Sequence, residues 1–216
     1  VNIRKKSEIM INKEMMKIME LKDYYELQGI DNFISNAKMY DLKSSLIASG
    51  FPMRPVIDYT ENDEKLKNRM RRLCNHPIGV GENNFLKGVM VNFDITLPVK
   101  VWTEWERYIH SPLISSSSTA HKIASFDVNQ FSKDTDTRII ELWDTIRKEY
   151  LAEPTKEKYL QLLHSTPTGV LLTARVTCSM MSLRNMYNQR KEHKLTEWRE
   201  FCKWCLTIPY FKELCN

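Results

Sequence analysis

The sequence lacks any long apolar run. No stretch approaches the roughly 18 consecutive apolar residues that a helix needs to cross a bilayer. Residues 1–22 are basic, but Lys and Glu interrupt their apolar positions, so they lack the continuous apolar core of a signal peptide. Both absences argue against a membrane partner, and we expect a cytoplasmic protein.

Patterns for disulfides and metal sites are also missing. Five cysteines are an odd number in a chain too large to need disulfides, which is typical of a reducing compartment. Cys202 and Cys205 form a C-x-x-C pair, but they fall late in an expected helix, whereas a redox pair opens a helix. The histidines have no metal-ligand spacing, so we expect no metal site.

The composition is that of a globular protein, with 42% hydrophobic and 27% charged residues. The 216 residues fit one domain, and no linker or internal repeat divides them. We expect a single α+β domain over residues 1–216, with a small central sheet flanked by helices and residues 1–14 as a loosely held extension. A net charge of +5 favours anionic ligands such as nucleotides.

Hydrophobic periodicity predicts the elements of this domain. Alternation of apolar and polar residues predicts strands, and apolar steps of three and four predict helices. The predicted strands cover residues 15–21, 89–96 and 173–178. The predicted helices cover residues 31–49, Thr60 past Leu73, Pro98 through Ile109, Asp134 or Thr135 through Tyr150, Pro154 through Leu163, and the chain from Met181 on.

The stretch from Thr173 to Trp204 contains the first candidate site. It begins as a strand and continues as a helix, in which Met181, Arg184, Asn188 and Lys191 recur at steps of three and four. These side chains share one helix face, and that face is polar. A polar face is either solvated or directed at a polar ligand, and spacing alone favours solvent.

The second candidate site is rich in hydroxyl groups. A run of serines is followed by Thr119, His121 and Lys122. Hydroxyl groups, free backbone N–H groups and these two basic side chains can together hold a phosphate. The alternative is a serine-rich loop or helix cap that contacts only water. The four serines are Ser115, Ser116, Ser117 and Ser118.

These stretches resemble the flavin-dependent thymidylate synthases. The step Ser182-Leu183-Arg184, with Asn188 one turn later, follows a strand that contains Thr and Arg, as in the C-terminal segment of that family. The run Glu197–Glu200 is similar to the start of the family's next helix. The resemblance covers residues 85–125 and 165–210.

One family motif is absent. In the family, a strand and a helix lead into an Arg-His-Arg motif with a Ser three residues after its second Arg. This chain has the strand, the helix and the serine-rich segment in the same order, but it lacks Arg-His-Arg. If Ser115 occupies the motif serine, the triplet becomes His110-Ser111-Pro112, and a later motif Arg falls at Lys122. Neither Pro nor Ser replaces the planar fork that Arg offers to phosphate. The resemblance therefore supports a shared fold better than an unchanged reaction.

The resemblance implies roles for individual residues. In the family, sites lie between the subunits of a homotetramer, FAD is bound, and NADPH and methylenetetrahydrofolate are co-substrates for methyl transfer to deoxyuridine monophosphate. The family's second nucleotide-contacting Arg corresponds to Arg190 or to His193. The implied nucleotide and phosphate contacts are Ser115 to Ser118, His121, Lys122, Arg184 and Arg190, and the implied flavin contacts are Asn188, His193 and Arg175.

Three functions follow, in order of preference. The first is a nucleotide-binding protein like these synthases, with their activity kept or altered; no side chain forms a convincing general base or nucleophile, which a cofactor enzyme tolerates. The alternative is a non-catalytic nucleotide-binding or sequestering protein on the same fold. The third is a nucleic-acid-binding module using Lys65, Arg69 and Arg72, but its charges are dispersed and the spacing favours a solvated face.

Overall fold

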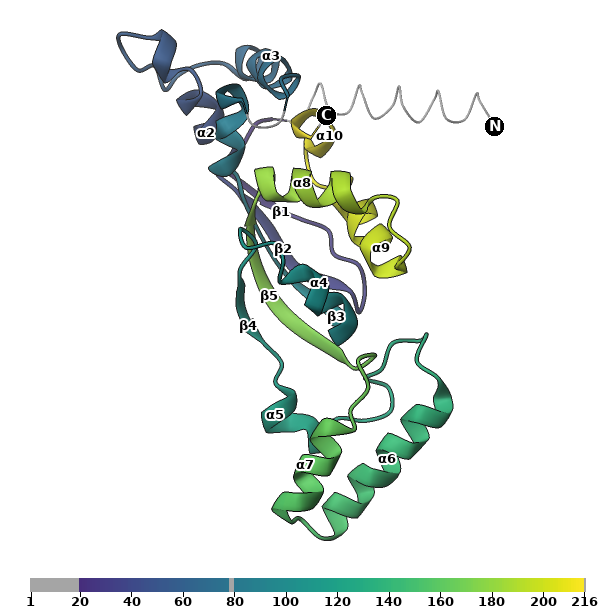
Figure 1. The fold of residues 1–216 in the computed structure, drawn as a ribbon. Coiled ribbons are helices and arrows are strands. Elements are labelled where there is room, and N and C mark those ends of the chain that lie inside the picture. Colours follow the sequence, from purple (N-terminus) through teal and green to yellow (C-terminus); the bar gives the residue numbers. More distant parts are fainter. Residues whose placement is uncertain (1–19, 78–79, 216) are drawn as a thin grey trace.

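A five-stranded sheet forms the centre of the molecule (Figure 1). The computed structural model describes residues 20–77 and 80–215, so the predictions for residues 1–14 and for most of 15–21 lie outside them. All neighbouring strands are antiparallel. Their spatial order is β1 (Tyr24–Glu26), β2 (Ile34–Tyr40), β3 (Met90–Pro98), β5 (Leu171–Ser179) and β4 (Leu113–Ser116).

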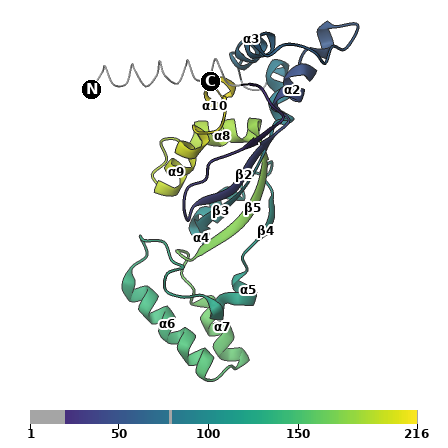
Figure 2. The same ribbon diagram turned by 180° about the vertical axis from the view of Figure 1, so that it is seen from behind.

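Helices lie on one face of the sheet and beyond both of its ends. Figures 1 and 2 show α4, α8 and α9 against one face, α2 and α3 beyond one end of the strands, and the α6–α7 hairpin beyond the other. The mixed α+β class is therefore confirmed. The helices are α2 (Leu42–Ala48), α3 (Asp63–Cys74), α4 (Val99–Trp105), α5 (Thr119–Lys122), α6 (Thr137–Ala152), α7 (Lys156–His164), α8 (Met180–Arg190), α9 (Thr196–Cys205) and α10 (Phe211–Leu214), with 3-10 turns η1 (Phe51–Met53), η2 (Gly81–Lys87) and η3 (Ile123–Ser125).

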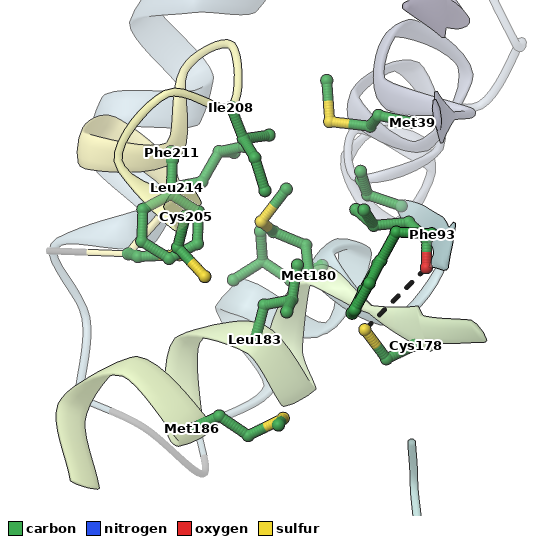
Figure 3. Close-up of a cluster of buried hydrophobic side chains, with 14 of the residues drawn as sticks. Met39, Phe93, Cys178, Met180, Leu183, Met186, Cys205, Ile208, Phe211 and Leu214 are labelled. Atoms are coloured by element: carbon green, nitrogen blue, oxygen red, sulfur yellow. Dashed lines mark hydrogen bonds between the residues drawn. The ribbon is translucent and has the colours of Figure 1, made fainter. Parts of the chain in front are cut away.

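Strands β3 and β5 form the longest ladder and confirm two predicted strands. Their register runs without interruption from Met90 opposite Ser179 to Pro98 opposite Leu171. Alternate residues of both strands are buried, because successive side chains point to opposite faces. Figure 3 shows buried side chains from β2, β3, β5, α8 and the C-terminal segment meeting in one cluster; they include Met39, Phe93, Cys178, Met180, Leu183, Met186, Ile208, Phe211 and Leu214.

The α6–α7 hairpin packs around a second, smaller cluster that contains Trp143. The sequence predicts Ile139 and Leu160 on the inward faces of these helices, and this prediction is wrong: they are 48% and 41% exposed. The hairpin packs mainly on itself and on η3, so only a narrow stripe of each helix is covered. Ile109, predicted to line the helix after Pro98, is also exposed, because α4 ends at Trp105.

The predicted helix over residues 31–49 is wrong for its first half, which forms β2. The ladder between β2 and β3 shifts register at a bulge, where Asn36 has φ 46°. The bulge separates buried Ile34 from buried Ala37 by three residues. Buried residues three positions apart are also typical of a helix, so the sequence of this bulged strand has the spacing expected of a helix.

The start of α3 differs from its prediction. Helix α3 begins after Asn62, whose side chain accepts a hydrogen bond from Lys65 N at 3.0 Å, rather than at Thr60. The predicted inward residues of α3 are buried, as are the aromatic residues Tyr210 and Phe211 near the C-terminus. Across residues 20–77 and 80–215, no helix has the length and apolar character needed to cross a membrane.

Candidate functional site

Both candidate stretches lie next to β5. The even-numbered residues of β5 from Ala174 to Cys178 are buried among the helices, so the odd-numbered residues from Thr173 to Thr177 lie on the opposite face. Ser179 then caps α8, because its Oγ accepts a hydrogen bond from Ser182 N at 3.2 Å. The strand-to-helix change predicted here is present in the structure.

Arg175 lies on the sheet face away from these helices. Its Nη1 donates hydrogen bonds to Asp94 Oδ1 at 3.0 Å and to the carbonyl of Asn36 at 2.8 Å. The side chains of Arg175 and Asp94 are each 27% exposed, so solvent reaches this ion pair. Ser115 is directly opposite Arg175 in the ladder between β4 and β5, but the Arg175 guanidinium reaches over β3 and β2, on the side of β5 away from β4.

The hydroxyl-rich segment follows the outer edge of the sheet. Strand β4 is the edge strand, and all its residues, Ser115 and Ser116 among them, are exposed. The backbone N–H of Ser117 continues the pairing by donating to a β5 carbonyl at 2.9 Å. Ser118 Oγ lies 2.8 Å from His121 Nδ1 at the start of α5. His121 and Lys122 are exposed, and their contacts within the described chain are local.

Arg184 does not lie on an exposed polar face. It is only 3% exposed, and its Nη2 donates to the carbonyl of Cys74 at 3.3 Å. Cys74 ends α3, where carbonyl groups lack partners within the helix and a cation is favourable. The face predicted from Met181, Arg184, Asn188 and Lys191 therefore divides, because Asn188 and Lys191 are exposed whereas Arg184 joins two helices.

Arg190, at the end of α8, is held by Glu104 of α4 and by Tyr108, three residues after the end of α4. Its Nε donates to the hydroxyl of Tyr108 at 2.7 Å, and its Nη1 donates to Glu104 Oε2 at 3.1 Å. The guanidinium also lies 4.6 Å from the centre of the Trp198 ring. The side chains of Arg190 and Glu104 are only 15% and 14% exposed. Both ends of the guanidinium therefore have protein partners.

Glu104 is the common acceptor of this cluster. Its Oε2 also accepts a hydrogen bond from Trp198 Nε1 at 3.0 Å and lies 3.6 Å from His193 Nε2. Burial alone would raise the pKa of the Glu104 carboxyl, but the Trp198 hydrogen bond and the Arg190 charge outweigh burial and lower it. His193 Nδ1 accepts a hydrogen bond from Leu195 N at 3.2 Å, so His193 also fixes the loop between α8 and α9.

A cleft of about 510 Å³ lies beside this cluster. Four segments line it: the start of α4, the loop before α6, the turn before β5 and the start of α9. Gly169 permits the close approach of two of them, because a Cβ there would lie 2.1 Å from Thr135 Oγ1. Lys100 and Lys194 are the basic residues of the lining, and Lys100 Nζ lies 3.8 Å from Glu104 Oε1.

Acidic and apolar groups complete the lining of the cleft. Asp134, Asp136 and Glu197 are its carboxylates. Asp136 is paired with Arg138, at 2.7 Å between Oδ2 and Nη2, which reduces its repulsion of an anion. Leu195 is one of several apolar residues in the wall.

Comparison with known proteins finds similarity at the level of structure. No protein-family model matches the sequence, and no curated protein matches it either. A crystal structure of the flavin-dependent thymidylate synthase ThyX from Helicobacter pylori, complexed with FAD and dUMP, matches with a TM-score of 0.65 and 14% identity over 82% of this chain and 94% of that chain. A second ThyX structure from the same organism, also with FAD and dUMP, matches with a TM-score of 0.66 and 14% identity over 82% and 93%.

The chain has the fold of the flavin-dependent thymidylate synthases. The expected resemblance in fold is therefore confirmed. At this identity the comparison concerns the arrangement of helices and strands, and the roles of the individual residues remain predictions.

Within one chain of this fold, the predicted residues form separate groups. Arg190 and His193 meet at Glu104, whereas Ser115 lies beside Arg175 on the other face. Figures 1 and 2 show α5 next to α7 beyond one end of the sheet, and α8 toward the other end on the helix-covered face. Inside one chain, the predicted contact residues thus do not lie together in one site, and only a second copy could bring the two groups together.

Sequence analysis missed Glu104 as the centre of the cluster. The apolar spacing of the helix predicted after Pro98 leaves Glu104 on its outer face, together with Lys100 and Arg107. The available signal was its position four residues after Lys100 and directly before buried Trp105. Lys194 gives no such signal, because only the folded loop between α8 and α9 brings it to the cleft.

Proposed function

We propose that this protein binds a nucleoside monophosphate in the cleft beside Arg190. The observation that carries the proposal is a cleft with apolar walls and two lysines, Lys100 and Lys194, on a fold that is also found in ThyX structures with dUMP and FAD. A cleft of about 510 Å³ lies within the usual range for small ligands, roughly 300–1,000 Å³. Lys100 and Lys194 would attract the phosphate, and the apolar wall at Leu195 would contact the base.

The described residues do not fit FAD in the way that the resemblance implies. If Ser115 occupies the motif serine, the triplet in place of Arg-His-Arg is His110-Ser111-Pro112, which has no guanidinium and in which Ser111 is only 2% exposed. Arg184 is engaged with the carbonyl of Cys74, away from the cleft. A flavin diphosphate therefore lacks the forked donors that would hold it. For this reason we favour a non-catalytic nucleotide-binding or sequestering protein.

The second candidate function is an active flavin-dependent methyltransferase. The match to two ThyX structures with FAD and dUMP favours it. It would need FAD as cofactor, with NADPH and methylenetetrahydrofolate as co-substrates, and the cofactor would carry the electrons. Absorbance in the usual flavin bands of the purified protein would support this function, and a colourless protein that still binds nucleotides supports the first.

We also propose a cytoplasmic homo-oligomer, a tetramer by resemblance, in which the segment from Ser115 to Lys122 of one copy faces the cleft of another. The exposure of Ser115 and Ser116 on the edge strand β4, and of His121 and Lys122 after it, supports the proposal. The segment would add hydroxyl groups, His121 and Lys122 to the phosphate end of the ligand.

Thermal unfolding with and without dUMP, dTMP, UMP and dAMP tests the proposed binding. At a concentration about 100 times the Kd, a ligand should raise the melting temperature by about 5 to 10 °C. Lys194→Ala should weaken the response, because it removes a basic residue from the cleft. Lys191→Ala is the matched control, since Lys191 is exposed nearby but does not line the cleft. No response to any of the four nucleotides, or equal losses in both variants, would contradict the proposal.

A further inference from the structure

The basic face of α3 forms one wall of a groove at the opposite end of the molecule from the α6–α7 hairpin (Figure 1). Lys65, Arg69 and Arg72 share this face, as their spacing predicts. Arg69 is engaged, because its Nη2 donates to Glu61 Oε1 at 2.5 Å. Arg54 pairs with the same carboxylate, so the charge of Glu61 is balanced within the protein.

Two cations of this face remain available. Lys65 and Arg72 are exposed, and in the described part of the chain they take part in no ion pair with a carboxylate. Together with balanced Glu61 and Arg69, they line a hollow of about 400 Å³. This hollow therefore has a net positive lining.

A larger, more apolar hollow adjoins it. Its volume is about 770 Å³, and Arg72 lines both hollows, so they adjoin at this side chain; the two together are called the groove below. Leu73 and Phe85 form a floor and are 9% and 8% exposed, and Met53, at the rim, is 88% exposed. The single carboxylate in the lining is that of Glu82. The groove thus changes along its length from apolar to basic.

Exposed apolar side chains follow Met53 along the chain. Val56 is 77% exposed and Tyr59 is 67% exposed. Isolated apolar residues on a surface are ordinary, but several in one short segment that also contributes Met53 to a hollow favour an interaction site.

We propose that this groove binds an anionic amphiphile, a molecule with an apolar body and a terminal phosphate or carboxylate. The guanidinium of Arg72 would take the head group through two parallel hydrogen bonds, and Lys65 would add charge. The apolar body would lie over Leu73 and Phe85. No residue of this groove lines the cleft with Lys100 and Lys194, so the proposal is independent of the proposed nucleotide site.

Calorimetric titration with dodecyl phosphate, below its micelle concentration, tests the proposal on the full chain. Dodecyl phosphate should bind at least about tenfold more tightly than neutral dodecyl maltoside or inorganic phosphate, because only it satisfies both ends of the groove. Equal affinity for dodecyl maltoside would overturn the proposal. Sedimentation with vesicles that contain phosphatidic acid distinguishes a lipid source from a free amphiphile; binding to vesicles without binding of the monomer would also overturn it.

Two variants with one matched control locate the site. Arg72→Ala should weaken dodecyl phosphate binding about tenfold, since a charge-assisted hydrogen bond is lost. Ala48→Phe should also weaken binding, because Ala48 lines the apolar hollow and is exposed enough to accept a larger side chain. Arg71→Ala is the control, because Arg71 is the exposed neighbour of Arg72 and lies outside both hollows. Equal losses for Arg71→Ala and Arg72→Ala, or no effect of Ala48→Phe, would overturn the assignment.

The same variants separate this proposal from the nucleotide site. Arg72→Ala should leave the response to dUMP unchanged, because Arg72 does not line the cleft with Lys100 and Lys194. If Arg72→Ala abolished nucleotide binding, the groove would be the nucleotide site, and the separate amphiphile site would be disproved.

Discussion

The cluster around Glu104 and the segment from Ser115 to Lys122 both contain polar side chains expected to bind a ligand, but they are built differently. In the cluster, Arg190 donates to a carboxylate and a hydroxyl group and covers an indole ring. In the segment, most side chains are exposed, and the contact of His121 is with the neighbouring Ser118. A buried cation thus joins helices, whereas an exposed group remains available to a ligand or to another copy.

Removal of Glu104 should have the largest effect on stability. Glu104→Ala leaves the Arg190 guanidinium at 15% exposure without its carboxylate and removes the acceptor of Trp198 Nε1. We expect a loss of about 3 kcal/mol in the free energy of unfolding, measured by urea denaturation. Glu106→Ala is the control, because Glu106 is exposed two residues further along the chain and should change stability by less than about 0.5 kcal/mol. Similar small changes in both variants would show that the cluster does not hold the helices together.

Arg184→Ala should have the next largest effect. It removes a buried side chain that donates to the carbonyl of Cys74 and joins α8 to the end of α3. We expect a loss of about 2 kcal/mol in the free energy of unfolding by urea denaturation. The variant should still respond to dUMP, because Arg184 lies away from the cleft. A stable variant without a nucleotide response would instead support the contact that the resemblance implies for Arg184.

Arg184 and Glu104 show how much of the molecule could be predicted from the sequence. The strands β3 and β5 and the buried faces of α3 and α9 follow from local periodicity, which is present in the sequence. The position of Arg184 depends on a carbonyl group 110 residues away, and spacing within α8 contains no information about it. Glu104 was assigned to solvent for the same reason, since its partners Arg190 and Trp198 are 86 and 94 residues away.

A change in the segment from Ser115 to Lys122 should have the smallest effect on stability, and it tests whether this segment completes the cleft of another copy. Ser118→Ala removes a single contact with His121, so the free energy of unfolding should change by less than about 0.5 kcal/mol. If the segment completes the cleft of a second copy, the same change should weaken dUMP binding by about threefold to tenfold, the usual value of one hydrogen bond to phosphate. Ser165→Ala, an exposed serine outside both regions, is the control for calorimetric titration. The loss should disappear at protein concentrations at which light scattering finds only monomers, because a monomer has no second segment; a loss that persisted in monomers would show that the segment acts within its own chain.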